Sequence, residues 1–520
     1  MLFVAAGCYE DKGSYDYSYS NRVTVEFPPL GQQMLGERVL YTPTVTFDDQ
    51  APEGDFEYWW ANTGKGINAI SQFGDAIEFD TICKTKELNY IPNVDGFNIL
   101  RFYVREKATG AITERPFTLT VGTPYTRGWM VLSRDASGKS LLSFVRPGSK
   151  TVDNVKVREF TPYPNAYAEM FPDDELGTNP ELLRVQYALA SFGGSVVFVF
   201  QEDSPVVLGG NTLGKERPFT DMFAPAAPEG FHPKDFRDAL SNPNFSIVLS
   251  TDRKIYTRHI GNMYSAGLYS NPYSSTAASN KGEEVTVDLM PESNVFTSKA
   301  QLLVDLTAKK AQWYIYNAQP TGMGNTGQIA EAAYSGTAPD FDFRDFGDAE
   351  PVFFYGYPQS FNTGRYLVVY KKDGVYKYLF TNAAKGFTAP PPMTMTLQKQ
   401  GEFPAEYGVS ESSVFHYYGT TTQQYMFFGV GNKLYHYEYN TDRFTLFYTL
   451  PEGEVIVDML DNPQRTELVV VTEGGTFVVI GLTDMRAGML VYETTLPGTI
   501  IDLEYKYSDF SAAQGRITDF

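Results

Sequence analysis

Four aspartates in one short segment could bind a metal ion. Asp340, Asp342, Asp345 and Asp348 lie in the stretch Asp-Phe-Asp-Phe-Arg-Asp-Phe-Gly-Asp. Ca²⁺ is bound by several oxygen ligands that one loop supplies at fixed spacing. The first two aspartates fit the start of such a loop, but the third is out of register and the closing glutamate is absent. The alternating phenylalanines favour a strand with a polar outer face, and we expect no bound metal.

The chain offers few residues for hydrolytic or zinc chemistry. The histidines His232, His259, His416 and His436 lack the spacing of zinc ligands, and the sequence contains no HExxH, GxSxG or P-loop motif. The segment Ser133–Gly138 resembles the Asp-box hairpin of sialidase-type propellers, but it is one residue too long and lacks the Thr-Trp that should follow. An Asp-Gly hairpin is also a common turn. We therefore predict no catalytic residue and no cofactor.

One cysteine lies in a context that predicts lipid attachment. Cys8 follows an apolar run that ends in Ala5-Ala6-Gly7, and Glu10 and Asp11 come soon after it. This pattern resembles the bacterial lipobox, in which the cysteine thiol takes a diacylglycerol, and the acidic pair resembles the surface-export signal of Bacteroidetes lipoproteins. The run before Cys8 is shorter than a signal peptide, so we expect the natural start to lie upstream. A buried free cysteine is the alternative interpretation.

Composition excludes several classes of partner. The net charge is −20, which argues against nucleic acid and against binding to anionic membranes by charge. No long apolar run follows Cys8, so the expected membrane contact is the lipid anchor alone. Cys83 is the only other cysteine, and we expect it to pack as a small apolar residue.

Residue usage predicts an all-β protein. The chain has 36 Tyr, 38 Phe, 45 Gly and 31 Pro, which indicates many strands joined by tight turns. Helical periodicity is nearly absent, and the segment Pro228–Asn242 is the best candidate for a helix.

The chain divides into a tether and two β regions. We assign residues 1–22 to a signal remnant and tether, and residues 23–122 to an immunoglobulin-sized β-sandwich. The strand-like runs of this sandwich are Val23–Phe27, Val39–Phe47, Phe56–Trp60, Glu87–Ile91, Asn98–Glu106 and Arg115–Val121.

The sandwich resembles the PKD-like domain of Bacteroidetes lipoproteins. The runs Phe56–Trp60, Leu88–Tyr90, Phe97–Val104 and Phe117–Val121 carry this resemblance. The WDFGDG-like stretch of the archetypal PKD domain is missing, so the resemblance is to the PKD-like branch.

Residues 123–520 carry a repeat that predicts a β-propeller. Seven segments share an apolar strand, a polar turn and a second apolar or aromatic strand, and they recur about every 56 residues, slightly more than one four-stranded blade needs. The segments are Met130–Val145, Val196–Leu208, Ile247–Ile260, Leu302–Tyr316, Leu367–Phe380, Met426–Tyr439 and Leu468–Gly481. We predict seven blades, with six or eight left open because the first and fourth strands are poorly marked.

Adjacent tryptophans are the best candidates for ligand or partner contact. Trp59 and Trp60 face opposite sides of a strand, so one is expected in the sandwich core and the other at the surface, where it could stack on a sugar or peptide. Trp129 and Trp313 are expected to pack inside the propeller.

Two classes of function remain open. The resemblance implies a non-catalytic lipoprotein on the outer membrane, facing the cell exterior. It would be an accessory of a SusC/SusD-type importer, with a SusC-like TonB-dependent transporter and a SusD-like lipoprotein as partners and an oligosaccharide or oligopeptide as ligand. The alternative is a propeller enzyme, sialidase-like or lyase-like, that acts on glycans.

Overall fold

The chain is represented by a computed structural model. It describes residues 22–47, 55–66, 79–153, 155–187, 195–239, 242–259, 268–274, 282, 284–292, 300–315, 328–360, 363–385, 393–419 and 423–508. The chain divides into two compact units, unit 1 (Met1–Pro124) and unit 2 (Tyr125–Phe520). Both are built almost entirely of β-strands, which confirms the predicted all-β class.

Unit 1 is a two-layered β-structure. Its strands are β1 (Val23–Glu26), β2 (Gln33–Met34), β3 (Val39–Tyr41), β4 (Thr44–Phe47), β5 (Phe56–Gly66), β6 (Asp80–Cys83), β7 (Leu88–Tyr90), β8 (Gly96–Glu106) and β9 (Ile112–Gly122). One layer is the sheet β2-β9-β8-β5-β6, and the pairs β1-β4 and β3-β7 supply the rest. The run expected as a single strand over Val39–Phe47 is divided at Pro43, which has no N–H for a ladder, so β3 and β4 enter different sheets.

A tryptophan occupies the centre of unit 1. Trp60 is fully buried, and its ring packs on Phe102 with centroids 4.7 Å apart and on Tyr41 at 6.4 Å. Its indole N–H donates to the Lys86 carbonyl over 3.1 Å. Trp59 points to the other side and stacks flat on Tyr103 at 4.8 Å. The prediction that one of the two tryptophans lies in the core is confirmed.

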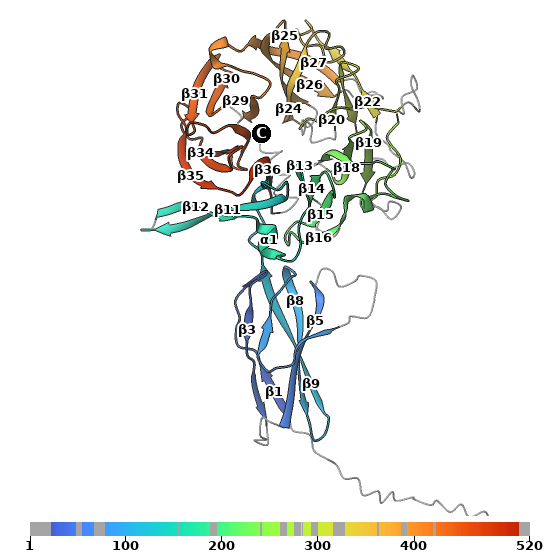
Figure 1. The fold of residues 1–520 in the computed structure, drawn as a ribbon, viewed down its shortest axis with the longest axis vertical. Helices are drawn as coiled ribbons and strands as arrows, with labels where there is room; N and C mark the ends of the chain where they lie inside the picture. The colour runs from blue at the N-terminus through green and yellow to red at the C-terminus, as the bar shows by residue number, and fades with distance from the viewer. Residues whose placement is uncertain are drawn as a thin grey trace, which may run out of the picture. The chain divides into compact units, whose positions relative to one another are not determined.

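Unit 2 consists of short sheets arranged in a ring, antiparallel except for the parallel pair of β23 and β27 (Figure 1). Its described residues form seven sheets, with strand orders β12-β11-β10-β36, β13-β14-β15-β16, β17-β18-β19, β20-β21-β22, β23-β27-β26-β25-β24, β28-β29-β30-β31 and β32-β33-β34-β35. The strands of the first half are β10 (Gly128–Arg134), β11 (Ser140–Val152), β12 (Val155–Tyr163), β13 (Pro180–Gln186), β14 (Val196–Gln201), β15 (Val206–Gly209), β16 (Lys215–Pro218), β17 (Pro233–Ala239), β18 (Asn242–Ser250), β19 (Ile255–His259), β20 (Ala300–Asp305) and β21 (Lys310–Ile315). Those of the second half are β22 (Gln328–Ala330), β23 (Ala332–Tyr334), β24 (Glu350–Ser360), β25 (Thr363–Lys372), β26 (Val375–Lys385), β27 (Met393–Glu402), β28 (Val414–Gly419), β29 (Gln424–Val430), β30 (Lys433–Glu438), β31 (Arg443–Thr449), β32 (Ile456–Asp461), β33 (Glu467–Thr472), β34 (Thr476–Gly481), β35 (Met489–Thr495) and β36 (Thr499–Lys506). Such a ring of sheets is a β-propeller-like fold.

The last strand of the chain closes the ring. In most sheets the strand that comes first in sequence lies innermost, but the innermost strand of the sheet containing β10 is β36. The pairing of β36 with β10 runs from Gly128 opposite Lys506 to Arg134 opposite Thr499. The two ends of unit 2 are therefore held in one sheet.

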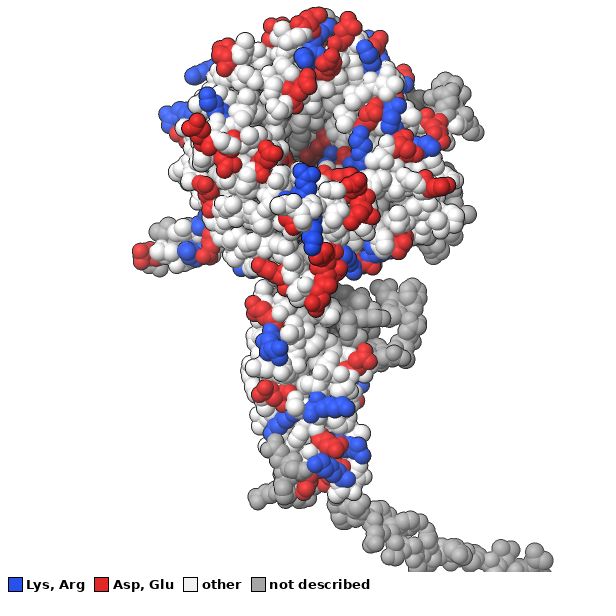
Figure 2. Space-filling view, viewed as in Figure 1, with Lys and Arg blue, Asp and Glu red and all other residues white. Residues whose placement is uncertain are grey.

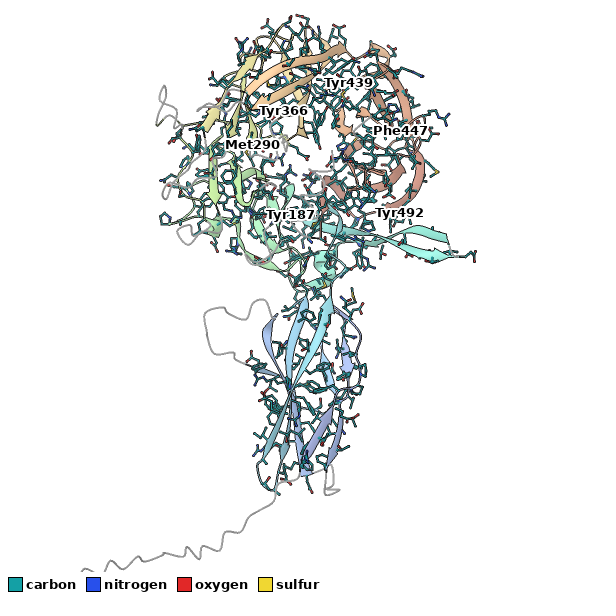
Figure 3. All side chains as sticks on the ribbon, turned by 180° about the vertical axis from the view of Figure 1, so that it is seen from behind. Tyr187, Met290, Tyr366, Tyr439, Phe447 and Tyr492 are labelled. Carbon is teal, nitrogen blue, oxygen red and sulfur yellow. The ribbon has the colours of Figure 1, made fainter. Side chains whose placement is uncertain are left out.

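The repeat predicted from sequence is confirmed as hairpins. All seven predicted segments contain a hairpin of adjacent antiparallel strands, which are β10–β11, β14–β15, β18–β19, β20–β21, β25–β26, β29–β30 and β33–β34. Apolar layers fill the space between neighbouring sheets (Figure 3). Trp129 and Trp313 are buried in these layers, as predicted.

The predicted helix over Pro228–Asn242 is wrong. This segment contains β17, which pairs with β18, and Phe236 is buried while its polar neighbours lie on the inner side of the ring. The sequence hides this alternation because the half-buried neighbours of Phe236, Asp235 and Arg237, are charged. The short described helix α1 (Ala166–Met170) was not predicted.

The predicted strand in the aspartate-rich segment is also wrong. Residues 340–348 form turns, and Phe341, Phe343 and Phe346 are all buried. The backbone carbonyl of Phe343 accepts the N–H of Ala311 at the start of β21, and the N–H of Phe346 donates to the Lys309 carbonyl in the β20–β21 turn. The phenylalanines anchor a loop, and Asp342 forms an ion pair with Arg344.

The two adjacent tryptophans give a matched test of unit 1. Trp60→Ala leaves a cavity among packed rings and should lower the free energy of unfolding by about 3–5 kcal/mol. Trp59→Ala removes a stacked surface pair and should cost about 0.5–1.5 kcal/mol. Denaturant unfolding of the full chain, followed by circular dichroism, measures both. Equal losses in the two variants would contradict this account of the core.

Candidate functional site

The inner segments of the ring surround a cavity, which we call the central cavity. Its volume is about 390 Å³, within the range of small-ligand sites. Its lining comes from seven segments, which are β13, β17, residues 291–292, β24, β28, β32 and β36. Figure 2 shows the hollow at the centre of the ring with charged side chains in it. Residues 288–292 take the inner position beside β20, where Leu289 bridges Val304.

β-Bulges aim side chains into the central cavity. Five of the inner strands shift register by one residue against their neighbours, and a bulge re-aims the side chains that follow it. In β17, β32 and β36 the residue after the bulge is an aspartate, which is Asp235, Asp458 and Asp502 respectively. A core residue follows, and the next residue lines the cavity, as in Arg237 and Glu504.

Three carboxylates tie neighbouring inner strands together. Asp502 of β36 accepts the backbone N–H of Leu183 in β13 over 2.7 Å, and Asp458 of β32 accepts that of Leu503 over 3.1 Å. Asp238 of β17 accepts the N–H of Tyr187 over 3.3 Å. Tyr187 lies on the inner side of the ring in Figure 3. These bonds connect strands that share no ladder.

Two arginines form the positive part of the site. Arg184 lies 3.2 Å from Asp235, 3.1 Å from Asp502 and 3.8 Å from Glu504. Burial alone would lower the pKa of Arg184, but these carboxylates raise it above its usual value. Arg237 lies 3.1 Å from Asp235, and burial lowers its pKa. Both guanidinium groups are therefore held in place by ion pairs rather than by water.

Burial makes several cavity carboxyl groups weak acids. It raises the pKa of Asp238 to about 7. Burial and the neighbouring charge of Asp502 raise the pKa of Asp458 to about 7, and burial raises that of Asp502 as well. The pKa of Glu504 rises to about 8, mainly through burial. Asp238, Asp458 and Glu504 can therefore exchange protons near neutral pH.

Aromatic side chains line the other arc of the cavity. Tyr357 of β24 and Tyr417 of β28 are stacked with ring centroids 3.7 Å apart. Tyr355 lies 5.8 Å from Tyr417 and 5.9 Å from the His416 ring, and Phe353 packs beside it. Tyr355 and Phe353 are half-buried and line the cavity. This side offers ring faces with few charges.

No metal centre is found where the chain is described. None of its groups of His, Cys, Asp and Glu is arranged to hold a metal ion, and the aspartate-rich segment forms none. His416 lies 3.0 Å from Asp461, and His436 bonds the Met485 carbonyl. Of the helices in the described ranges, none has the length and apolarity needed to cross a bilayer.

Few of the residues singled out by sequence contribute to this site. Cys8, Glu10 and Asp11 lie outside the described residues. Trp60 is in the core of unit 1, and Trp59 remains a predicted contact residue. The Asp135 carboxylate accepts the backbone N–H groups of Ser137 and Lys139, as in an ordinary turn.

Sequence reasoning missed the residues of the central cavity. The available signal was a repeated pattern of a polar residue, a buried apolar residue and a residue that lines the cavity. It is present as Asp235-Phe236-Arg237, Asp458-Met459-Leu460 and Asp502-Leu503-Glu504.

The raised pKa values predict that stability falls as pH rises. Between the unfolded pKa near 4 and a folded pKa of about 7, the folded Asp458 keeps a proton that the unfolded chain has lost. The free energy of unfolding should therefore decrease from pH 5 to pH 8. In Asp458→Asn this decrease in the free energy of unfolding should be smaller by on the order of 1–2 kcal/mol. This value discounts the pKa shift of Asp458 for partial solvent screening. Denaturant unfolding at several pH values measures this.

The exposed Asp484 provides the matched control. Its pKa is lowered to about 2 by the Arg486 side chain, so Asp484→Asn should leave the slope from pH 5 to pH 8 unchanged. His436, whose pKa is lowered by burial, contributes with the opposite sign and is common to all variants. Equal slopes in wild type and Asp458→Asn would contradict the assignment.

Comparisons with known proteins identify a family for one part of the chain. Residues 8–170 match the PKD-like family. A quinonprotein alcohol dehydrogenase-like protein from Bacteroides thetaiotaomicron VPI-5482 shares 14% identity over 94% of this chain and 100% of its own, with a TM-score of 0.44. AztD from Citrobacter koseri shares 11% over 86% and 97%, with a TM-score of 0.35. No curated protein matches the chain. The chain thus carries a PKD-like segment. Its β-propeller-like fold follows from the arrangement of its own strands.

Proposed function

We propose that this chain is a surface-exposed outer-membrane lipoprotein that binds a small ligand in the central cavity without catalysis. In this proposal it is an accessory subunit of a SusC/SusD-type importer, anchored through Cys8 and exported through Glu10 and Asp11. Each of the seven sheets of unit 2 is one blade of a seven-bladed propeller.

The observation that carries the proposal is the central cavity. Its polar groups converge from separate sheets and are held by ion pairs and backbone hydrogen bonds, as with Arg184 and Asp502. Because these side chains are already held in place, little free energy is lost in ordering them when a ligand binds. The match of residues 8–170 to the PKD-like family supports the lipoprotein part, since the resemblance implies that setting.

A second candidate function is a glycan-active enzyme. A carboxyl group that keeps its proton near neutral pH can act as a general acid, and Asp458 and Glu504 have pKa values of about 7 and about 8. Incubation with complex glycans separates the two candidates. Reducing ends that appear with wild type and not with Asp458→Asn would favour the enzyme, whereas their absence favours binding.

The lipoprotein proposal predicts a location that can be measured in cells. Expressed with its natural upstream sequence in a Bacteroidetes host, the protein should be digested by protease added to intact cells. Cys8→Ala should release it from the membrane, because an acyl anchor is then absent. Changing both Glu10 and Asp11 to Ala should leave it anchored but protected from protease.

The partner is tested in the same membranes. Affinity purification of the wild type should recover a TonB-dependent transporter and a SusD-like lipoprotein. Full membrane retention of the Cys8→Ala protein would contradict the anchor, and purification without any transporter would contradict the importer role.

A further inference from the structure

We propose that the central cavity binds a ligand that carries an ammonium or guanidinium group next to a flat apolar face. The cationic group would lie among the carboxylates of β17, β32 and β36, and the flat face against the rings of β24 and β28. This inference rests on the ligand-binding part of the proposed function and names the chemical class of the ligand.

The two kinds of lining occupy different arcs of the ring. Contacts between inner strands run from β24 through β28, β32 and β36 to β13 and β17. The aromatic side chains Tyr355, Tyr357 and Tyr417 belong to β24 and β28, which are neighbours. The strands on the other arc supply Arg184, Arg237 and most of the carboxylates. A ligand in the cavity therefore meets rings on one side and charges on the other.

The charged arc has an excess of carboxylates. Six carboxyl groups line the cavity, against three guanidinium groups. The carboxyl groups belong to Asp238, Glu292, Asp458, Asp461, Asp502 and Glu504, and the guanidinium groups to Arg184, Arg237 and Arg465. Asp235, which pairs with both Arg184 and Arg237, adds a further carboxyl group beside the site. Where these carboxyl groups are ionised they outnumber the guanidinium groups, so a further positive charge would be stabilised here, whereas an anion would add repulsion.

Three carboxylates can accept further hydrogen bonds. Among the described residues, Asp238 and Asp458 form no ion pair, and their recorded partners are backbone N–H groups. Glu504 reaches Arg184 only at 3.8 Å. A carboxylate has about four acceptor positions, so each can take hydrogen bonds from a ligand. Charge-assisted bonds of this kind are about twice as strong as neutral ones.

The aromatic arc suits the rest of such a ligand. Tyr355 and Phe353 are half-buried, so part of their ring surface faces the cavity. Ring faces bind flat apolar surfaces, and they also attract a nearby cation. A basic peptide side chain beside an aromatic residue fits this description, and so does an amino sugar with its apolar ring face. Both carry the same chemistry, and experiment can separate them.

The test is calorimetric titration of the intact chain with matched probes at pH 8.5, where a Glu504 carboxyl group with a pKa of about 8 is mostly ionised. The peptide pair is N-acetyl-lysyl-tyrosine amide and its uncharged counterpart N-acetyl-norleucyl-tyrosine amide. The sugar pair is 6-amino-6-deoxyglucose and glucose. In at least one pair the cationic member should bind about tenfold more tightly than the neutral one, as expected for one charge-assisted contact. If the cationic member binds more tightly in only one pair, that pair identifies the ligand as a basic peptide or as an amino sugar.

Variants locate the binding in the cavity. Glu504→Gln keeps the shape of the side chain and should weaken the cationic probe about five- to tenfold while leaving the neutral probe unchanged. Glu493→Gln, on the outer strand β35, is the matched control and should change neither. Thermal unfolding of both variants checks that they remain folded.

Three outcomes would overturn the inference. They are equal binding of both members in both pairs, no binding of either cationic probe at millimolar concentration, or unchanged affinity in Glu504→Gln. If the transporter still co-purifies with the protein in any of these cases, the cationic ligand is wrong while the importer role stands. If the transporter is absent but the cationic probe binds, the importer role is wrong and the ligand class stands.

Discussion

The pairing of β36 with β10 is the constraint on which unit 2 depends. Without it, the ring would end in two exposed sheet edges, each a row of unpaired backbone groups. With it, residues nearly four hundred positions apart share a sheet, as Gly128 and Lys506 do. The same strand brings Asp502 and Glu504 to the cavity, and Asp502 then binds the backbone of β13. The strand that closes the ring therefore also supplies residues of the candidate site.

The charged groups of the central cavity destabilise the protein, and the same groups favour binding of a cationic ligand. Several carboxyl groups are buried far enough to hold protons near neutral pH, which means that their ionised forms destabilise the empty protein. Arg184 offsets part of this by pairing with three of the surrounding acids. A cationic ligand would offset more of it, so the feature that weakens the empty ring is the one that favours binding.

The sequence predicted the framework of the fold better than its centre. The hairpins were predictable because their strands are continuous apolar runs, such as Leu468–Thr472, separated by polar turns. The inner strands were not, because they face a polar cavity and carry residues such as Asp235 and Arg237 where a buried strand usually has valine or isoleucine. For that reason the sequence around β17 predicts a helix rather than a strand. The charged residues that disguised the inner strands are those that form the candidate site.

The two units differ in how much of their structure can be predicted from sequence. In unit 1 the core residue could be predicted from two adjacent aromatic residues, because a strand places Trp59 and Trp60 on opposite faces. In unit 2 the site depends on bulges and on contacts between strands of different sheets, as between Asp458 and Leu503. Neither a bulge nor a contact between sheets leaves a local pattern that a single sequence reveals.

Hydrogen exchange with and without whichever cationic probe binds in the calorimetric titration tests the central claim most directly. The claim is that a ligand binds where the inner strands meet. The amide groups of Leu183, Tyr187 and Leu503 donate to cavity carboxylates and should exchange more slowly when the probe is bound. Amides of the outer strands β16 and β35 should be unaffected. Protection confined to outer strands or to unit 1, with no change at these three amides, would contradict the account.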